Sequence, residues 1–260
     1  MVMTEHPDVV DRVNKESYER KDILKHYESI DLLSDPERTL LEKLLPLIKD
    51  KKLLDIGIGA GRTTKFLLEI SKDYTGIDYS LGFVELVRKK YKESDIRHCD
   101  ARDLRIFSDN TFDLILFSFN GIDYVIHEDR IKVLKEIHRV LKPGGFFIFS
   151  THNRDCKQFN KLPWDEKTPL TFSYLKSCLY SLYYLPRHLK MRKYQRHMAE
   201  YAIINDNAHG YSLLTYYISI EEQIKQLESL GFEYIEAYDM EAVPVNNTSS
   251  SSWVYYLARK

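Results

Sequence analysis

Three glycines at alternate positions, Gly57, Gly59 and Gly61, stand in the stretch LLDIGIGAGRTT. The chain of 260 residues contains only 10 glycines, so this cluster indicates a local need for a bare backbone. Because glycine has no Cβ, a ligand can approach the main chain closely there, and amides at the start of a following helix point into the same space. The residues predict a ligand-binding turn between a strand and a helix.

Asp55, which stands just ahead of the glycines, bears on the class of ligand. A carboxylate at this point repels a pyrophosphate and attracts a cation, such as the amino group of an amino acid. The spacing G-x-G-x-G also differs from the G-x-G-x-x-G pattern of dinucleotide-binding turns. A nicotinamide- or flavin-dependent oxidoreductase is therefore disfavoured.

Two further acids follow later strands of the same region. Asp78 lies 23 residues after Asp55, a separation that fits one strand–helix–strand step. A carboxylate that accepts two hydroxyl groups can recognise a ribose, and this is the role we expect for Asp78. Asp100 is the second candidate. Each acid could instead cap a helix or form a turn.

These residues need a scaffold, and the hydrophobic pattern predicts one. Short apolar runs such as KKLLDIG, DYTGID and FDLILFSF alternate with segments of helical period, which predicts an α/β fold with a parallel sheet covered by helices on both faces. The alternation stops over residues 152–216, which we interpret as an insertion. It resumes with a capped helix beginning near Ser219 and ends with a strand in WVYYLARK.

Composition narrows the function further. Lys plus Arg number 38 and Asp plus Glu number 39, so the whole molecule has no electrostatic attraction to nucleic acid or anionic membranes. The three cysteines, Cys99, Cys156 and Cys178, are widely spaced and form no C-x-x-C, and we expect neither a disulfide framework nor a metal site. Without an apolar leader or a run of roughly 20 apolar residues, we expect a cytoplasmic protein with no membrane partner.

Together the motifs resemble those of class I S-adenosylmethionine-dependent methyltransferases. LLDIGIGAGRTT resembles the family's D-x-G-x-G-x-G motif, YTGIDYS the end of its second strand, and CDARDL its third-strand segment. FDLILFSFNGIDYV and IHRVLKPGGFFIFS resemble the fourth and fifth strand regions. The resemblance covers residues 50–150 and 217–260 and implies a doubly wound, seven-stranded, mostly parallel sheet.

The resemblance also implies a cofactor, S-adenosyl-L-methionine, with S-adenosyl-L-homocysteine as product. It divides the chain into N-terminal helices covering the site (1–49), a Rossmann-like domain (50–151 and 217–260) and a substrate lid inserted between strand five and the last helix (152–216). The expected cofactor-binding residues are Asp55, Gly57, Gly59, Gly61, Arg62, Asp78, Tyr79, Ser80, Asp100, Ala101, Arg102, Ser118, Phe119 and Asn120.

Methyl transfer from a sulfonium is an in-line displacement, so the protein mainly aligns the nucleophile and keeps it unprotonated. The catalytic candidates are Tyr124, His127, His152 and His209. Each histidine could equally be an ordinary surface or helix-capping residue. Candidates for substrate binding are Asp123, Arg192, Arg196 and Tyr211.

The insertion bears on the acceptor. PRHLKMRKYQRH contains five basic residues and no acid, which favours phosphate or carboxylate, although a solvated helix face would look the same. We expect a small acceptor, anionic or sugar-like, that is methylated at O or N. A homodimer is compatible with the sequence. The alternatives are an RNA methyltransferase, with tyrosines stacking on bases, and a non-catalytic binding protein of the same fold.

Overall fold

The structure is a computed structural model that describes residues 7–165 and 169–260. The predicted segments 1–49 and 152–216 therefore each include residues, 1–6 and 166–168, that lie outside the described part. The helices are α1 (Pro7–Tyr18), α2 (Lys21–Glu28), α3 (Asp35–Ile48), α4 (Thr64–Ile70), α5 (Leu81–Lys90), α6 (His127–Val140), α7 (Phe172–Met191) and α8 (Ile220–Ser229). Short 3-10 turns are η1 (Gly121–Tyr124), η2 (Pro163–Asp165) and η3 (Arg192–Tyr194).

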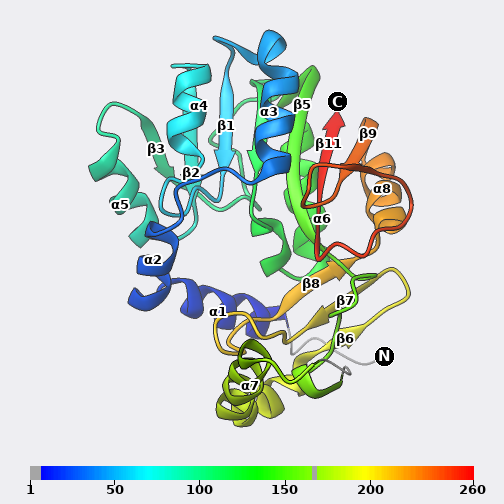
Figure 1. Ribbon diagram of the computed structural model, residues 1–260. Helices are drawn as coiled ribbons and strands as arrows, with labels where there is room; N and C mark the ends of the chain where they lie inside the picture. Colours follow the sequence, from blue (N-terminus) through cyan, green and yellow to red (C-terminus); the bar gives the residue numbers. More distant parts are fainter. Residues whose placement is uncertain (1–6, 166–168) are drawn as a thin grey trace.

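One mixed sheet forms the centre of the molecule (Figure 1). Its strands are β1 (Leu53–Ile56), β2 (Tyr74–Asp78), β3 (Asp95–His98), β4 (Phe112–Phe117), β5 (Leu141–Asn153), β6 (Arg196–His197), β7 (Tyr201–Ile204), β8 (Thr215–Ile218), β9 (Glu233–Tyr238), β10 (Pro244–Val245) and β11 (Trp253–Arg259). The order along the sheet is β10-β9-β11-β5-β4-β1-β2-β3, and β8 continues it from the end of β5. Pairing is parallel from β3 to β5 and antiparallel from β5 through β11 and β9 to β10.

The predicted count of seven strands is wrong, because the described residues form an 11-stranded sheet. Three of the additional strands, β6, β7 and β8, begin in the segment interpreted as an inserted lid, and β8 crosses the predicted boundary at residue 217. The strands β6 and β10 have two residues each, which is too short to leave an alternation in the sequence.

Helices cover the central sheet on both faces, as the alternating sequence predicted. Leu53 and Leu114 belong to the core cluster that also holds residues of α3, α4 and α5. Leu54 and Ile115, one position along each strand, belong to the cluster that holds residues of α6 and α8. Successive side chains of a strand point to opposite faces, so a parallel strand needs apolar residues on both.

The N-terminal helices and the insertion lie at the carboxyl ends of the parallel strands, with α1 next to β7, β8 and α7, and α2 next to α5 (Figure 1). Asn14 fixes α1 there, since its amide donates to the backbone oxygens of Tyr124 and Leu214 at 2.8 and 2.9 Å. Among the described residues, none of the helices has the length and apolarity needed to cross a bilayer.

Candidate active site

The three glycines between β1 and α4 all adopt left-handed backbone conformations, with φ of +67°, +50° and +82° at Gly57, Gly59 and Gly61. A Cβ on Gly57 would lie 2.9 Å from the ring of Phe117, and one on Gly61 would lie 3.1 Å from the ring of Tyr91. A Cβ on Gly59 would meet nothing within 4 Å. Packing therefore requires glycine at the outer positions, whereas Gly59 faces open space.

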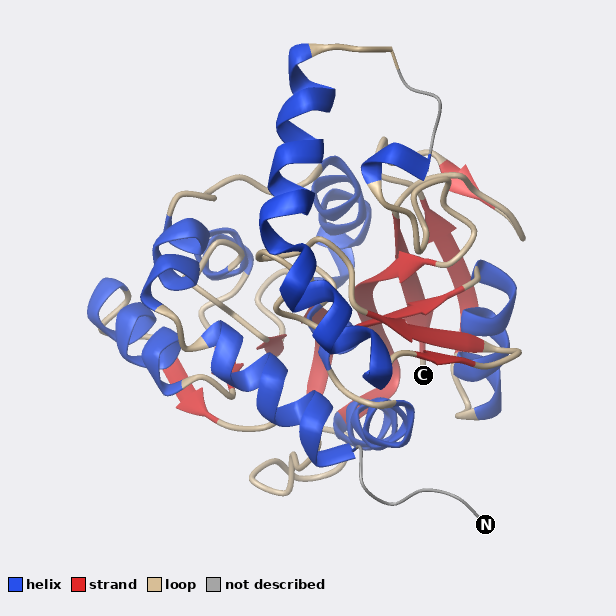
Figure 2. Ribbon diagram, turned by 90° about the horizontal axis from the view of Figure 1, so that it is seen from below, coloured by secondary structure: helices blue, strands red, loops and turns tan. Residues whose placement is uncertain are grey.

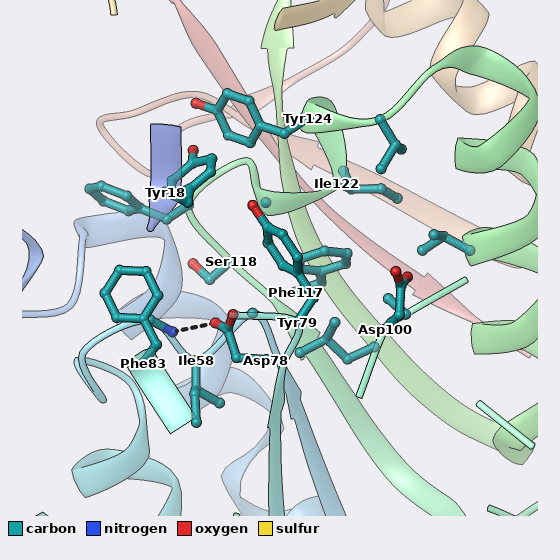
Figure 3. A pocket seen from close by; sticks show the side chains of 18 of the residues that line it. Tyr18, Ile58, Asp78, Tyr79, Phe83, Asp100, Phe117, Ser118, Ile122 and Tyr124 are labelled. Atoms are coloured by element: carbon teal, nitrogen blue, oxygen red, sulfur yellow. Dashed lines mark hydrogen bonds between the residues drawn. The ribbon is translucent and has the colours of Figure 1, made fainter. Parts of the chain in front are cut away.

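That space is a cavity at the carboxyl ends of β1, β2 and β4, which we call the first cavity (Figure 3). The expected cofactor residues that line it are Gly57, Gly59, Arg62, Asp78, Tyr79, Asp100, Ala101, Arg102, Ser118 and Phe119. Four segments that are separate in sequence, after β1, β2, β3 and β4, therefore meet around one space. Asp55, Gly61, Ser80 and Asn120 lie outside the lining.

Asp78 ends β2 and points into the first cavity (Figure 3). Its carboxylate accepts hydrogen bonds from the backbone amides of Gly59 and Ser80 at 2.9 and 2.8 Å. Burial raises the pKa of Asp78 to about 6, and the hydrogen bonds from these amides oppose the rise. Asp78 is thus held at the loop with a carboxylate that is ionised at neutral pH.

Asp55 has a different place from the one its sequence position suggested. Asp55 is 1% exposed and does not line the cavity. Its carboxylate is therefore not placed to contact the amino group of a ligand directly, as its sequence position had suggested. Its carboxylate accepts from the hydroxyls of Thr63 and Tyr74 at 2.7 and 3.0 Å, and burial raises its pKa to about 7. Asp55 therefore contacts the segment around the glycine loop on the side that faces away from the cavity.

Arg102 joins the third-strand segment to the N-terminal helix. Its guanidinium lies 2.6 Å from the carboxylate of Asp100, 3.0 Å from that of Asp129 and 2.8 Å from that of Asp11 in α1. Asp100 and Arg102 both line the first cavity, and so does Asp11. The ion pairs therefore hold one end of α1 against the wall formed by residues 99–102.

Tyrosines from α1 and α2, which no sequence motif marked as site residues, complete the first cavity. Tyr18 and Tyr27 line it together with Phe83. The ring of Tyr18 lies edge-on to that of Tyr124, with 5.1 Å between centroids, and 6.1 Å from the ring of Tyr27. The N-terminal helices were expected to cover the site, but their sequence did not indicate which side chains face the cavity.

Arg62 forms an ion pair with Glu37, a partner that the sequence did not indicate. Glu37, which is 0% exposed, receives both guanidinium nitrogens of Arg62 at 2.5 and 2.7 Å and also a hydrogen bond from Ser118. Glu37 also accepts from the backbone amide of Ser34, which is the capping box at the start of α3. The capping pattern accounts for one role of Glu37, whereas its contact with the cavity wall appears only in the structure.

A second cavity of about 820 Å³ lies between the end of β5 and the inserted segment. Its lining includes three of the predicted residues, His152, Arg192 and Tyr211. Tyr217 and Trp253 supply further aromatic surface. The ring of His152 lies 4.9 Å from that of Tyr217 and 5.7 Å from that of Trp253, measured between centroids.

Two side chains of the first cavity form the wall toward the second. The Tyr124 ring lies edge-on to His152 at 6.3 Å, and the Phe119 ring lies edge-on to Trp253 at 5.0 Å. Phe119 and the next residue, Asn120, have φ of +55° and +58°. Such left-handed conformations cost about 1–3 kcal/mol each outside glycine and cluster at functional sites. A strained loop thus separates the two cavities.

His152 and Asp123 form a buried pair behind this wall. Asp123 is 0% exposed and accepts from His152 Nδ1 at 2.7 Å, from the hydroxyl of Thr151 at 2.6 Å and from Arg130 at 2.5 Å. A bond to a carboxylate places the proton of the neutral imidazole on Nδ1, which leaves Nε2 as an acceptor. Nε2 lies 3.5 Å from the side-chain nitrogen of Asn120.

This pair changes the role expected for Asp123. The sequence suggested that it binds substrate, but its carboxylate is fully enclosed and lines neither cavity. Charge compensation by Arg130 keeps a carboxylate acceptable in this buried position. Asp123 therefore orients His152, and His152 is the side chain of the pair that reaches a cavity.

The other histidine candidates are placed away from both cavities. His127 shares a hydrogen bond of 2.8 Å with the Tyr216 hydroxyl and stacks on Tyr201 at 4.3 Å between centroids. His209 packs against the rings of Tyr18 and Tyr27 from outside the first cavity. Burial lowers the pKa of both imidazoles, so both are neutral at pH 7.

The expected substrate residue Arg196 lies in β6 and lines neither cavity. No cluster of three or more residues suited to hold a metal ion occurs in the described ranges 7–165 and 169–260. Tyr124, one of the predicted catalytic candidates, lines the first cavity.

Comparison with known proteins adds to this geometry. Residues 54–149 match a family described as a methyltransferase domain. Residues 54–149 of this chain thus form a methyltransferase domain. A "Probable S-adenosylmethionine-dependent methyltransferase" of Mycolicibacterium smegmatis is 32% identical over 104 residues, which is 40% of this chain and 39% of that protein. A demethylmenaquinone methyltransferase of Geobacillus is 33% identical over 136 residues, 47% of this chain and 56% of that protein.

The chain thus spans about half of the length of these relatives, or less. Solved structures show the same fold at low identity. One is a Burkholderia thailandensis 1,6-didemethyltoxoflavin-N1-methyltransferase with its acceptor and S-adenosylhomocysteine bound, with a TM-score of 0.61, 15% identity and coverage of 100% of this chain and 92% of that one. Another, from Thermotoga maritima, is described as a possible histamine N-methyltransferase, with a TM-score of 0.52, 18% identity and coverage of 97% and 92%.

The residues of the methyltransferase domain fit its cofactor, S-adenosylmethionine. Gly59 leaves the main chain bare where a Cβ would enter the first cavity, and Asp78 presents an ionised carboxylate beside it. The aromatic side chains of Tyr18, Tyr79 and Phe83 supply apolar surface to the same cavity.

The raised pKa of Asp78 predicts how cofactor binding depends on pH. The carboxylate accepts hydrogen bonds fully only when ionised, and an acid whose pKa is about 6 is ionised above pH 6 and protonated below it. We expect the affinity for S-adenosylmethionine to fall about tenfold from pH 7 to pH 5. Calorimetry across this range tests it, with Asp78→Asn as the control that should show no such fall.

Proposed function

We propose that this protein transfers a methyl group from S-adenosylmethionine to an oxygen or nitrogen of a small acceptor that carries a ring. The observation that carries this proposal is the first cavity, in which the side-chain-free Gly59 and the Asp78 carboxylate meet. S-adenosylmethionine supplies an electrophilic methyl group on a sulfonium. The Gly57–Gly61 loop and Asp78 would hold it, with Asp78 accepting from the ribose, and Asp100 and Ala101 would border the adenine.

The second cavity supports a small acceptor rather than a long polymer. Aromatic side chains of His152, Tyr217 and Trp253 form a surface on which a flat or sugar ring can pack. The predicted anionic character of the acceptor is supported by Arg192 at the edge of this cavity. Arg196, the other predicted cation, does not line it.

His152 is the base that we propose for an acceptor with an O–H or N–H group. Its Nδ1–H is committed to Asp123, so Nε2 can take the proton released as the acceptor atom gains the methyl group. Asp123, which is paired with Arg130, stabilises the imidazolium that forms. The rings of Tyr124 and Phe119 stand between the two cavities. Transfer therefore requires these rings to move aside, so that the acceptor atom can reach the sulfonium methyl group in line.

Binding and turnover measured together test the proposal. Calorimetry should show micromolar or tighter binding of S-adenosylmethionine or S-adenosylhomocysteine, and Asp78→Ala should weaken it at least about tenfold, because two charge-assisted hydrogen bonds to the ribose are lost. Methyl-labelled S-adenosylmethionine is then incubated with a panel of phenols, aromatic amines and sugar phosphates, and labelled products are counted. Absence of cofactor binding refutes the proposal. Cofactor binding without transfer to any of them would favour a non-catalytic binding protein.

A further inference from the structure

Helix α7 of the inserted segment has its hydrophobic side chains on the outside. Its solvent-facing apolar residues, each between 49 and 77% exposed, are Phe172, Leu175, Leu179, Leu182, Tyr183 and Leu189. Successive members are three, four, three, one and six residues apart, and at 3.6 residues per turn these positions fall on one face of the 20-residue helix. Figure 2 views the molecule from the side of α7, the long helix that crosses in front of the other elements. We call these six residues the leucine face.

Polar contacts fix the helix in this orientation. On the opposite face, the Ser181 hydroxyl lies 3.0 Å from that of Tyr211, and His188 Nδ1 lies 2.9 Å from the side-chain oxygen of Asn205. Both inner residues are buried, at 1 and 8% exposed. Rotating α7 to bury the leucine face would break these hydrogen bonds and leave polar groups without partners, so the apolar residues remain outside.

The charged side chains on α7 and just after it are all basic. Residues 169–199 contain no Asp or Glu. Their basic residues are Lys176, Arg187, Lys190, Arg192, Lys193 and Arg196. Arg192 lines the second cavity, so the other five are the ones that we assign to the leucine face. The ammonium of Lys176 lies 4.6 Å above the ring of Phe172, so charge and apolar surface adjoin directly. An apolar stripe flanked by basic side chains is the pattern of a helix that lies in the plane of an anionic membrane.

We propose that α7 docks on an anionic phospholipid bilayer, with the leucine face in the acyl region and the basic margins at the headgroups. A second copy of the chain on a two-fold axis would bring these positive margins against each other, which is unfavourable. RNA would match the charge but would leave the leucines unburied. The neutral total charge and the missing membrane-spanning run, which led us to expect no membrane partner, are both uninformative about a helix that lies in the interface.

Vesicle flotation tests this docking without any need for methyl transfer, so it stands apart from the test of the proposed function. The full-length protein is mixed with vesicles of phosphatidylcholine alone or with 30 mol% phosphatidylglycerol. We expect at least tenfold stronger binding to the anionic vesicles, and weaker binding as salt rises. The double variant Leu179→Ser/Leu182→Ser should lose most of that binding.

Leu47→Ser is the matched control, because Leu47 is 57% exposed and lies on α3, outside the leucine face. It should bind anionic vesicles as the unchanged protein does. Circular dichroism and thermal melting establish that each variant is folded. Failure to bind anionic vesicles overturns the proposal, and so does binding that the double variant retains. Leucine-dependent dimerisation in sedimentation, or binding of a single-stranded RNA oligonucleotide, in place of vesicle binding would assign the face to those partners instead.

Discussion

Replacing His152 with glutamine is expected to lower the methyl-transfer rate about a hundredfold or more while the affinity for S-adenosylmethionine stays within about twofold. General bases contribute on the order of 10²- to 10⁴-fold, and glutamine has no basic nitrogen to take the proton. His152 lines the second cavity and not the first, so the cofactor site keeps its contacts. Single-turnover transfer and calorimetry measure the two quantities separately.

His127→Gln is the matched control for this variant. His127 is also partly buried and hydrogen-bonded to a tyrosine, but it lines neither cavity, so transfer should change less than threefold. Transfer by His152→Gln that stays within a few-fold of the unchanged protein would exclude His152 as the base. Asp123→Asn should also slow transfer, since an amide can favour the other imidazole tautomer and cannot stabilise an imidazolium.

Replacing Arg130 with methionine is expected to reduce the free energy of unfolding by about 3–5 kcal/mol. Arg130 and Asp123 are both 0% exposed, and the guanidinium lies 2.5 Å from the carboxylate. The same guanidinium donates to Gln223 at 2.7 Å and to the Thr151 hydroxyl at 3.2 Å. Methionine matches much of the side-chain volume but leaves a buried carboxylate with no cation. Urea unfolding followed by circular dichroism gives the change.

A double-mutant cycle separates charge from packing. In the Arg130→Met/Asp123→Leu protein both charges are absent, and the loss of stability should be clearly smaller than the sum of the losses of the two single variants. Arg105→Met serves as the surface control: Arg105 pairs with Asp103 at 2.5 Å but is 85% exposed, and its loss should have little effect. Additive losses in the cycle would mean that Arg130 acts through packing alone.

Sequence patterns alone predicted the features that depend on local chemistry. The left-handed turn at Gly57–Gly61 needs residues without a Cβ. The alternation of strand and helix follows from the hydrophobic period. Both features can therefore be predicted from the sequence alone. The position of Asp78 followed because parallel strands end at one edge of a sheet, where residues from successive strands meet. The start of α8 at the Ser219 cap followed in the same way.

Only the tertiary structure decided which side chains act as pairs and which face outward. Asp123 and His152 are 29 positions apart, and Arg62 and Glu37 are 25 apart, so no local spacing marks these pairs. Asp55 faces into the protein rather than the cavity because Thr63 and Tyr74 occupy its carboxylate. The leucines of α7 have the period of a core-facing helix, yet buried hydrogen bonds from Ser181 and His188 turn them to solvent. Hydrophobic period identifies a face, whereas the direction in which that face points depends on contacts made elsewhere in the chain.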